Sequence, residues 1–242
     1  MGGRAEWLEQ RRRLAWEHGR RVRDDLLSEF ANRYAELKVP PPAKIIDELL
    51  SDFLDVELRY DPLASNVFAQ TECVGGRLRV TVNSMTSNIR GVRDSEGVQN
   101  VAKWHEAIHV IDDAEVVRND LQPTLPGLTG TKLVCYRAPA GGRSRVELSR
   151  EFWAEEAGRA AAVSHEALKL SVSFAELCEL ASSRRGPISE AWPLLYRSAA
   201  DIGVNITALV RQLSLEGRIS LQGAAGRDVH VQPALMRVME AG

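Results

Sequence analysis

Apolar residues recur every three or four positions along much of the chain, which is the spacing of one face of an α-helix. In the N-terminal part this spacing predicts one helix through residues 7–31 and a second helix over residues 45–53. Three prolines at 40–42 lie between them and predict a break, because proline cannot continue the interior of a helix. The chain is therefore expected to begin with a helical region.

A β-region follows, in which short apolar segments are bounded by turn-forming residues. In Arg77–Asn83 the side chains of Leu78, Val80 and Val82 alternate with polar ones, which is typical of a strand with one buried face. The pattern predicts two further strands, then a loop rich in Pro, Gly and Thr, and after it a hairpin of two strands. These segments are Val56–Tyr60, Asn66–Thr71, the loop Gln122–Gly130, and the hairpin strands Lys132–Ala138 and Arg143–Leu148.

Helical spacing returns over residues 94–109 and again from about Ser149. From Ser171 onward it predicts three helices, with a turn at Gly203 between the last two. The expected fold class is α+β, with a small β-sheet between helical regions. We expect an N-terminal helical region at 1–55, a core at 56–170 and a C-terminal helical, helix-turn-helix-like region at 171–242.

Composition narrows the classes of function. The chain has 242 residues, of which 44% are hydrophobic and 26% charged, as in a folded globular protein. Its 31 Lys and Arg against 33 Asp and Glu give a net charge of −2, which supplies no general attraction for nucleic acid. No apolar run approaches the ~20 residues that span a bilayer, so we expect no membrane partner and a cytoplasmic location. The three cysteines form no close pair and are expected to be ordinary buried thiols, at Cys73, Cys135 and Cys178.

The segment most indicative of chemistry is His105-Glu106-Ala107-Ile108-His109, an H-E-x-x-H motif. Two histidines four residues apart on a helix project from one face and can reach one zinc ion. The intervening Glu106 would stand beside the open coordination position, where it can act as the general base toward a water molecule. Random placement of His and Glu would produce the motif about once in a hundred such chains, and a solvated His-Glu-His face is the alternative. Against that alternative, the same side of the helix carries the apolar residues Val98, Val101, Ala102 and Ile108.

A zinc site needs a third protein ligand. The positions where metzincins carry a helix-breaking glycine and a third histidine hold Asp112 and Glu115, so that route is closed. A second helix supplies Glu156, which shares a stripe with Phe152 and Val163 and is therefore expected to be buried, where a carboxylate needs a partner. We predict Glu156 as the third ligand. Glu155 and Asp113 are lesser candidates, a buried ion pair of Glu156 is the alternative, and Glu151, Glu155 and Arg159 follow one another as on a solvated face.

This arrangement resembles the ImmA/IrrE metallopeptidase family. The likeness rests on the strand R-L-R-V-T-V-N-S, the helix N-V-A-K-W-H-E-A-I-H, the segment E-E-A-G-R-A-A-A and a helix-turn-helix-like tail. The resemblance implies a zincin-like core and a zinc endopeptidase that cleaves a protein, in particular a helix-turn-helix transcriptional repressor. It also implies that His105, His109 and Glu156 are the zinc ligands and that Glu106 is the catalytic base.

The substrate contacts are predicted from the strand that precedes the motif helix. Zincin-type peptidases use an edge strand there to pair with an extended substrate backbone, so we expect Val80, Val82 and Asn83 in the substrate site. Tyr136 is added because a Tyr, His or Arg donor is wanted for the oxyanion of the intermediate. His165 and Arg93 are the other candidates for that donor, and the sequence does not choose among the three.

The C-terminal region leaves an alternative function open. Residues 199–213 look like a helix-turn-helix, and residues 184–228 contain six Arg against four acidic residues. A DNA-reading helix normally presents a denser basic face, so we favour helical packing over direct DNA contact. The rival readings are a DNA-binding or protein-binding regulator with a non-catalytic zinc site, and a toxin–antitoxin component that forms a complex without cleavage.

Overall fold

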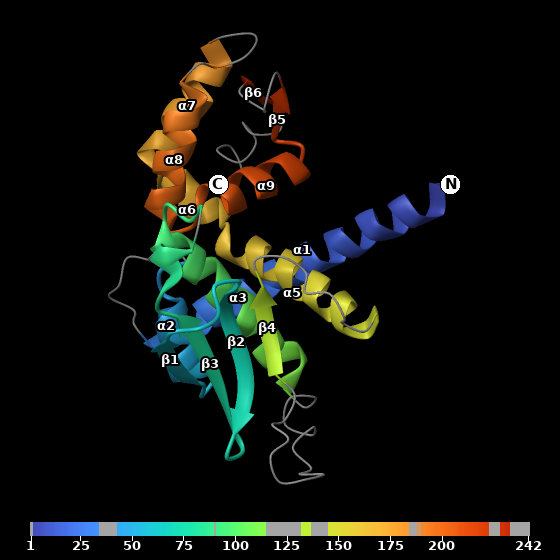
Figure 1. Cartoon of the computed structure of the whole chain (residues 1–242). Coiled ribbons are helices and arrows are strands. Elements are labelled where there is room, and N and C mark those ends of the chain that lie inside the picture. Colours follow the sequence, from blue (N-terminus) through green and yellow to red (C-terminus); the bar gives the residue numbers. More distant parts are fainter. Residues whose placement is uncertain are drawn as a thin grey trace.

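The computed structural model describes residues 2–33, 43–89, 91–114, 132–136, 145–183, 188, 190–222 and 228–232. For 2–5, 30–33, 132–136 and 145–148 it describes the backbone alone. Figure 1 shows helices and two small sheets, in chain order α1 Gly2–Arg33, α2 Ile46–Glu48, the π-helical turn η1 Leu49–Phe53, β1 Glu57–Asp61, β2 Val67–Val74, β3 Arg77–Asn83, the 3-10 turn η2 Thr86–Asn88, α3 Ser95–Asp112, β4 Lys132–Tyr136, α5 Arg145–Ala162, α6 His165–Leu170, α7 Val172–Ser183, α8 Ala191–Ile202, α9 Ile206–Leu215, β5 Ile219–Gln222 and β6 Asp228–Val231.

The larger sheet is mixed and has the strand order β1-β3-β2-β4. β1 runs parallel to β3, while β2 runs antiparallel to both β3 and β4. The expected α+β class is confirmed in this general sense. β3, however, lies between two strands and is not an edge strand, so the expectation that it pairs with a substrate backbone is wrong.

α3 is the central helix of the fold. The side chain of Asp94 accepts a hydrogen bond from the backbone N–H of Gly97 and so caps the N-terminus of the helix. Residues 102–110 are all buried, because α3 packs against β2 and β3 on one side and against α5 on another. The motif helix is therefore inside the protein on nearly every face.

Glycines allow the helices around α3 to approach closely. A Cβ atom on Gly158 of α5 would lie 2.7 Å from the Cα atom of His105, so the two backbones touch there. In the same way a Cβ on Gly19 of α1 would lie 2.0 Å from the carbonyl oxygen of Ala157. α1 thus packs along α5, and Figure 1 shows its N-terminal half extending beyond the rest of the protein.

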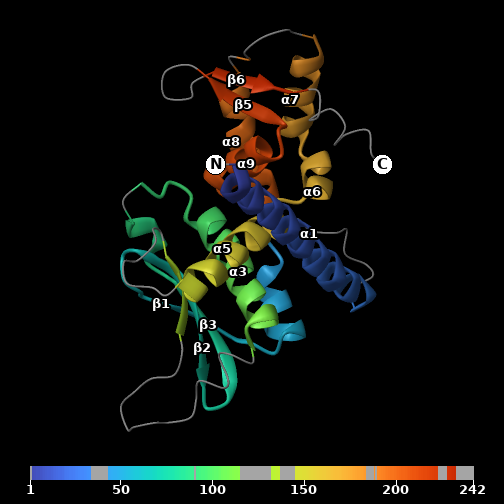
Figure 2. The ribbon, with the colours of Figure 1, turned by 90° about the vertical axis from the view of Figure 1, so that its right-hand side faces the viewer.

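The C-terminal elements form a unit of helices and a hairpin that lies at the opposite end of the protein from the larger sheet (Figure 2). The prediction that this region is entirely helical is wrong, because β5 and β6 pair as an antiparallel hairpin. The predicted turn between α8 and α9 is confirmed, with Gly203 in the left-handed conformation at φ +74°. Hydrophobic side chains of this unit and of the region around α3 form one continuous core, whose members run from Ala43 to Val229 in the sequence.

The elements of the middle region match the sequence in part. The predicted strands at 56–60, 66–71 and 77–83 correspond to β1, β2 and β3. The second strand of the predicted hairpin, Arg143–Leu148, is wrong, because α5 begins at Arg145. Leu148 in this segment lies four residues before Phe152, which is helical spacing and agrees with the start of α5. The prolines at 40–42 and the loop Gln122–Gly130 lie outside the described residues.

Two further expectations concern thiols and membranes. Cys73 and Cys178 are free and buried, as predicted, and burial raises the pKa of Cys178 to about 11. The side chain of Cys135 lies outside the description. In the described part of the chain, every helix is too short or too polar to cross a membrane.

The contact at Gly158 yields a prediction about stability. In a solvent-exposed helix, replacing Gly by Ala stabilises by about 1 kcal/mol. At Gly158 the added methyl group would press on the backbone of His105, so Gly158→Ala should lower the free energy of unfolding by about 1–3 kcal/mol. Urea titration followed by circular dichroism measures this change. An unfolding midpoint that rises, as helix propensity alone requires, would contradict the close packing.

Candidate metal centre

The two histidines of the motif face one another inside the protein. Their side chains are buried, and the Nε2 atoms of His105 and His109 lie 3.1 Å apart. The ring centroids are 4.8 Å apart in an edge-to-face arrangement. The structure therefore confirms that both imidazoles project from one face of α3 and meet.

A carboxylate from α5 completes this group. Glu151 has one oxygen 3.5 Å from Nε2 of His105 and the other 3.7 Å from Nε2 of His109. One donor atom from each of His105, His109 and Glu151 lies within 4.8 Å of the others, so the three could hold a metal ion. Two imidazole nitrogens and a carboxylate oxygen match the ligand types and number of a catalytic zinc site.

Charge at the centre is consistent with this grouping. Burial by itself lowers the pKa of His105, but a hydrogen bond with Glu151 and the charges of Glu106 and Glu151 raise it overall. The carboxylates therefore favour positive charge at the position that the two imidazoles share. A divalent cation at that position would be stabilised by the same negative charges of Glu106 and Glu151.

Glu156, the predicted third ligand, is elsewhere. It is fully buried, as expected, but its carboxylate contacts arginines and not the histidines. Oε2 accepts hydrogen bonds from Nη2 of Arg159 and from Nε1 of Trp16, the latter at 3.0 Å, and lies 3.5 Å from Nε of Arg12. Oε1 accepts from Nη2 of Arg211 at 3.4 Å. The alternative of a buried ion pair is thus the arrangement found for Glu156, and the carboxylate that the structure places beside the two histidines is Glu151.

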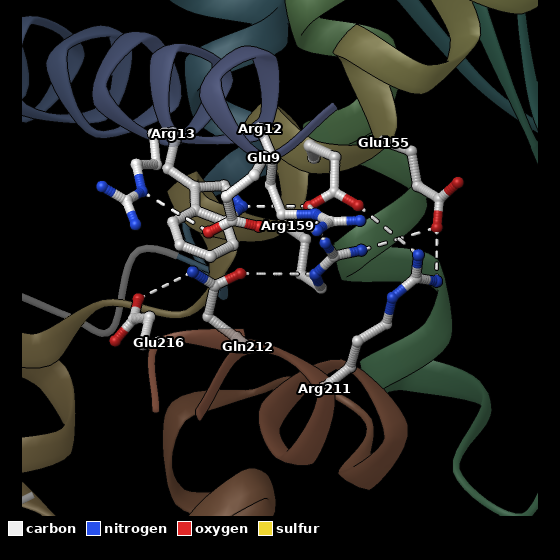
Figure 3. Close-up of polar contacts among 10 residues, drawn as sticks. Glu9, Arg12, Arg13, Glu155, Arg159, Arg211, Gln212 and Glu216 are labelled. Atoms are coloured by element: carbon white, nitrogen blue, oxygen red, sulfur yellow. Dashed lines mark hydrogen bonds and ion pairs between the residues drawn. The ribbon is translucent and has the colours of Figure 1, made fainter. Parts of the chain in front are cut away.

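The side chains that contact Glu156 come from three helices, and Figure 3 shows the arginines among them, Arg12, Arg159 and Arg211, close together. Arg12 and Trp16 come from α1, Arg159 comes from α5 itself, and Arg211 comes from α9. Arginine charge and hydrogen bonds outweigh burial and hold the pKa of Glu156 below its ordinary value, so the carboxylate is ionised. With its oxygens engaged by these donors, it is not available to a metal.

The error has an identifiable cause in how α5 is covered. The large apolar residues used to find the buried face point toward α1: Trp153 packs in a cluster with Ala15 and Val22, and Arg12 lies over the ring of Phe152. The face toward α3 is marked by small residues. Gly158 touches the backbone of His105, and Glu151 lies seven residues earlier on that face. Spacing from Gly158 was the signal that could have found Glu151.

Glu106 is held where the sequence predicted a base. Its side chain is fully buried, and Oε2 accepts a hydrogen bond of 2.6 Å from Oγ1 of Thr71 on β2. Its other oxygen, Oε1, has no hydrogen-bond partner among the described residues. Burial raises the pKa of Glu106, and the neighbouring histidines oppose that shift. A buried, unpartnered carboxylate oxygen beside two imidazoles is the group that a water molecule on a metal would satisfy.

Asp113, a lesser candidate for the third ligand, contacts the ring of His109 on the side away from the other histidine. Its Oδ2 lies 2.8 Å from Nδ1 of His109, and its Oδ1 lies 3.5 Å from Nε of Arg150. A carboxylate at Nδ1 fixes the imidazole so that Nε2 remains free to bind a metal. Glu155, the other lesser candidate, pairs with Arg211 at 2.6 Å.

The predicted substrate contacts are largely corrected. The side chains of Val80 and Val82 on β3 are fully buried in the core, so they cannot contact a substrate. Asn83 donates from Nδ2 to the carbonyl oxygen of Val67 at 2.7 Å and accepts from the backbone N–H of Met85, which fixes the loops at the strand end. Tyr136 is the last residue of β4 and pairs with Val67, but its side chain lies outside the description.

Two other candidates for the oxyanion donor are separated by the structure. Nε2 of His165 lies 2.9 Å from Glu216, and His165 does not line the cleft that includes His105. Arg93 instead lines a cleft of about 810 Å³ that also includes His105. Of these two, Arg93 is therefore the candidate that shares a cavity with the motif.

No protein-family model, curated protein or solved structure matches this chain significantly.

Two isosteric variants on α5 distinguish the proposed metal ligand, Glu151, from the carboxylate of the structural ion pair, Glu156. Glu151→Gln should weaken zinc binding at least about 100-fold, because a ligand is lost, and should change the stability of the metal-free protein little. Glu156→Gln should keep zinc binding but lower the free energy of unfolding by about 3 kcal/mol, because the buried Arg159 loses its ionic partner. Competition with a chelating dye measures the zinc affinity. Urea unfolding of the metal-free protein measures the stability. The opposite pattern would restore Glu156 as the ligand.

Neighbouring aspartates at the end of α3 test the role of Asp113. Asp113→Asn should weaken zinc binding about tenfold, since an amide orients His109 less strongly than a carboxylate. Asp112→Asn is the matched control, because Asp112 contacts His18 and Trp153 and neither motif histidine. Equal zinc affinities for the two variants would remove Asp113 from the site.

Proposed function

We propose that the protein is a zinc-dependent endopeptidase. The observation that carries the proposal is the convergence of His105, His109 and Glu151 beside the buried, unpartnered oxygen of Glu106. The two histidines and Glu151 would hold the zinc, and Asp113 would orient His109. When bound there, zinc would supply Lewis acidity that brings the pKa of a water molecule to about 7.

Glu106 performs the proton transfers in this proposal. Oε1 takes a proton as water attacks the scissile carbonyl carbon, and the same oxygen then delivers that proton to the leaving amine nitrogen. Thr71 holds Oε2, so the carboxylate keeps a single orientation through both steps. The raised pKa of Glu106 makes it a stronger base than an exposed glutamate, which suits proton transfer near neutral pH.

A polypeptide is the proposed substrate because a large cleft borders the candidate centre at His105. The cleft of about 810 Å³ reaches from His105 to the C-terminal helices, which is room for several residues of a chain. The resemblance to ImmA/IrrE peptidases adds a helix-turn-helix repressor as the expected substrate, and it rests on the sequence motifs alone.

The packing of α9 favours this function over direct DNA reading. In a helix-turn-helix the second helix must be free to enter the major groove. Here α9 is turned toward the rest of the protein: Arg211 contacts Glu155, Gln212 accepts from Arg159, and Glu216 contacts Arg20 of α1. Because these contacts lie within the chain, α9 does not present a free basic face.

Catalysis by Glu106 is tested with a library of quenched fluorescent peptides and zinc-loaded protein. Cleavage should disappear with a chelator and return with zinc. Glu106→Gln should reduce cleavage at least ~10²-fold while zinc stays bound, because an amide cannot accept the proton. Glu96→Gln, an exposed site near the start of the same helix, is the control and should cleave normally. Full activity of Glu106→Gln would refute the mechanism.

A further inference from the structure

A cleft runs along α3 from the metal centre toward the start of the helix. Its floor is formed by Val98, Val101, Ala102 and His105, which are spaced as one helical face. Sequence periodicity assigned this face to the core. In the structure Val98 and Val101 are only partly buried, because the face is open to the cleft.

The C-terminal unit provides one wall of this cleft. It consists of Tyr196, Ala199 and Ala200 of α8 and the first turn of α9, and Phe68 of β2 also lines the cleft. The wall is therefore built by the helices that the sequence identified as helix-turn-helix-like.

This wall is attached firmly to the motif helix. Nδ2 of Asn100 donates to the carbonyl oxygen of Gly203 at 2.9 Å, so the α8–α9 turn is bonded to α3. A Cβ on Gly97 would lie 2.6 Å from the backbone nitrogen of Asn205, which shows direct backbone contact at the same place. The cleft is thus largely preformed, which lowers the entropic cost of binding.

Charge in the cleft favours an apolar occupant over an acidic one. The charged side chains that line it are Arg93, Asp94, Glu155, Arg159 and Arg211, so the two acids nearly balance the three arginines. Arg159 and Arg211 are in addition paired with Glu155 and Glu156. The cleft wall near α5 is therefore close to neutral. What remains along the floor and the α8 wall is mainly valine and alanine, a surface that gains most from covering by apolar groups.

We propose that the α8–α9 unit selects the peptide substrate, and that the cleft binds a bulky apolar side chain, such as leucine or phenylalanine, next to the scissile bond. The proposal rests on the proposed endopeptidase function, since the cleft is read as leading from its metal centre. It gives the helix-turn-helix-like region a role in recognising a polypeptide.

Short peptides with a zinc-binding hydroxamate group test this without any need for cleavage. Two series carry the hydroxamate at the N-terminal or the C-terminal end, next to a residue with a methyl, isobutyl, benzyl or carboxyethyl side chain. Dissociation constants from zinc-loaded protein are measured by calorimetry. In one series the isobutyl or benzyl compound should bind at least about tenfold more tightly than the methyl compound, through added apolar burial. The carboxyethyl compound should gain nothing.

A cavity-filling variant locates the effect. Ala200 is exposed and lines the cleft away from the metal ligands, so Ala200→Trp should remove the isobutyl and benzyl gain while methyl-compound binding stays unchanged. Arg197→Trp places the same side chain on α8 outside the cleft lining and should keep the gain.

The outcomes separate the two proposals. If the methyl compound binds but longer apolar side chains gain nothing, or if the gain survives Ala200→Trp, the cleft assignment is overturned and the metal centre stands. Preference for the carboxyethyl compound would likewise overturn it. If the zinc-loaded protein binds no hydroxamate at all, the metal centre is wrong and both proposals fall.

Discussion

The backbone contact between α3 and α5 is the constraint on which the site depends. Gly158 has no side chain, so α5 can rest directly against the backbone of His105. Two turns earlier on the same face, that approach brings Glu151 within 4 Å of both imidazoles. A side chain at position 158 would separate the helices, and with them the carboxylate from the histidines. Which carboxylate joins the two histidines in the proposed metal centre therefore depends on the close approach of α5 to α3.

Neighbouring positions on α5 give two carboxylates different roles. Glu151 faces α3 and the histidines, while Glu156 faces α1 and α9 and is held by arginines. The ionised Glu156 links three helices, and the same arginines are thereby neutralised where they line the cleft. One ionic cluster thus fastens the C-terminal unit and leaves the adjoining cavity mainly apolar. Structure and recognition are coupled through α5.

The sequence pattern predicts those elements that depend on interactions between residues close together in the chain. The motif helix, the strands β2 and β3, and the turn at Gly203 follow from spacing, alternation and glycine conformation. Strand order is not contained in those patterns, so the sequence wrongly predicts β3 as an edge strand and Val80 as a substrate contact. The choice between Glu151 and Glu156 depends on which helix covers which face of α5, a tertiary property. Phe152 and Trp153 do lie on a covered face of α5, but the helix that covers it is α1. The short strands β5 and β6 were missed because four residues carry little periodicity.

The central claim is that His105, His109 and Glu151 together bind one zinc ion. A crystal structure of the zinc-loaded protein, with anomalous data collected across the zinc absorption edge, tests it most directly. The account predicts one strong peak about 2.0–2.2 Å from an Nε2 atom of each histidine and from a Glu151 carboxylate oxygen, with Glu156 still bound to arginines. A peak coordinated by Glu156, or the absence of a peak between the two histidines at full zinc loading, would contradict the account.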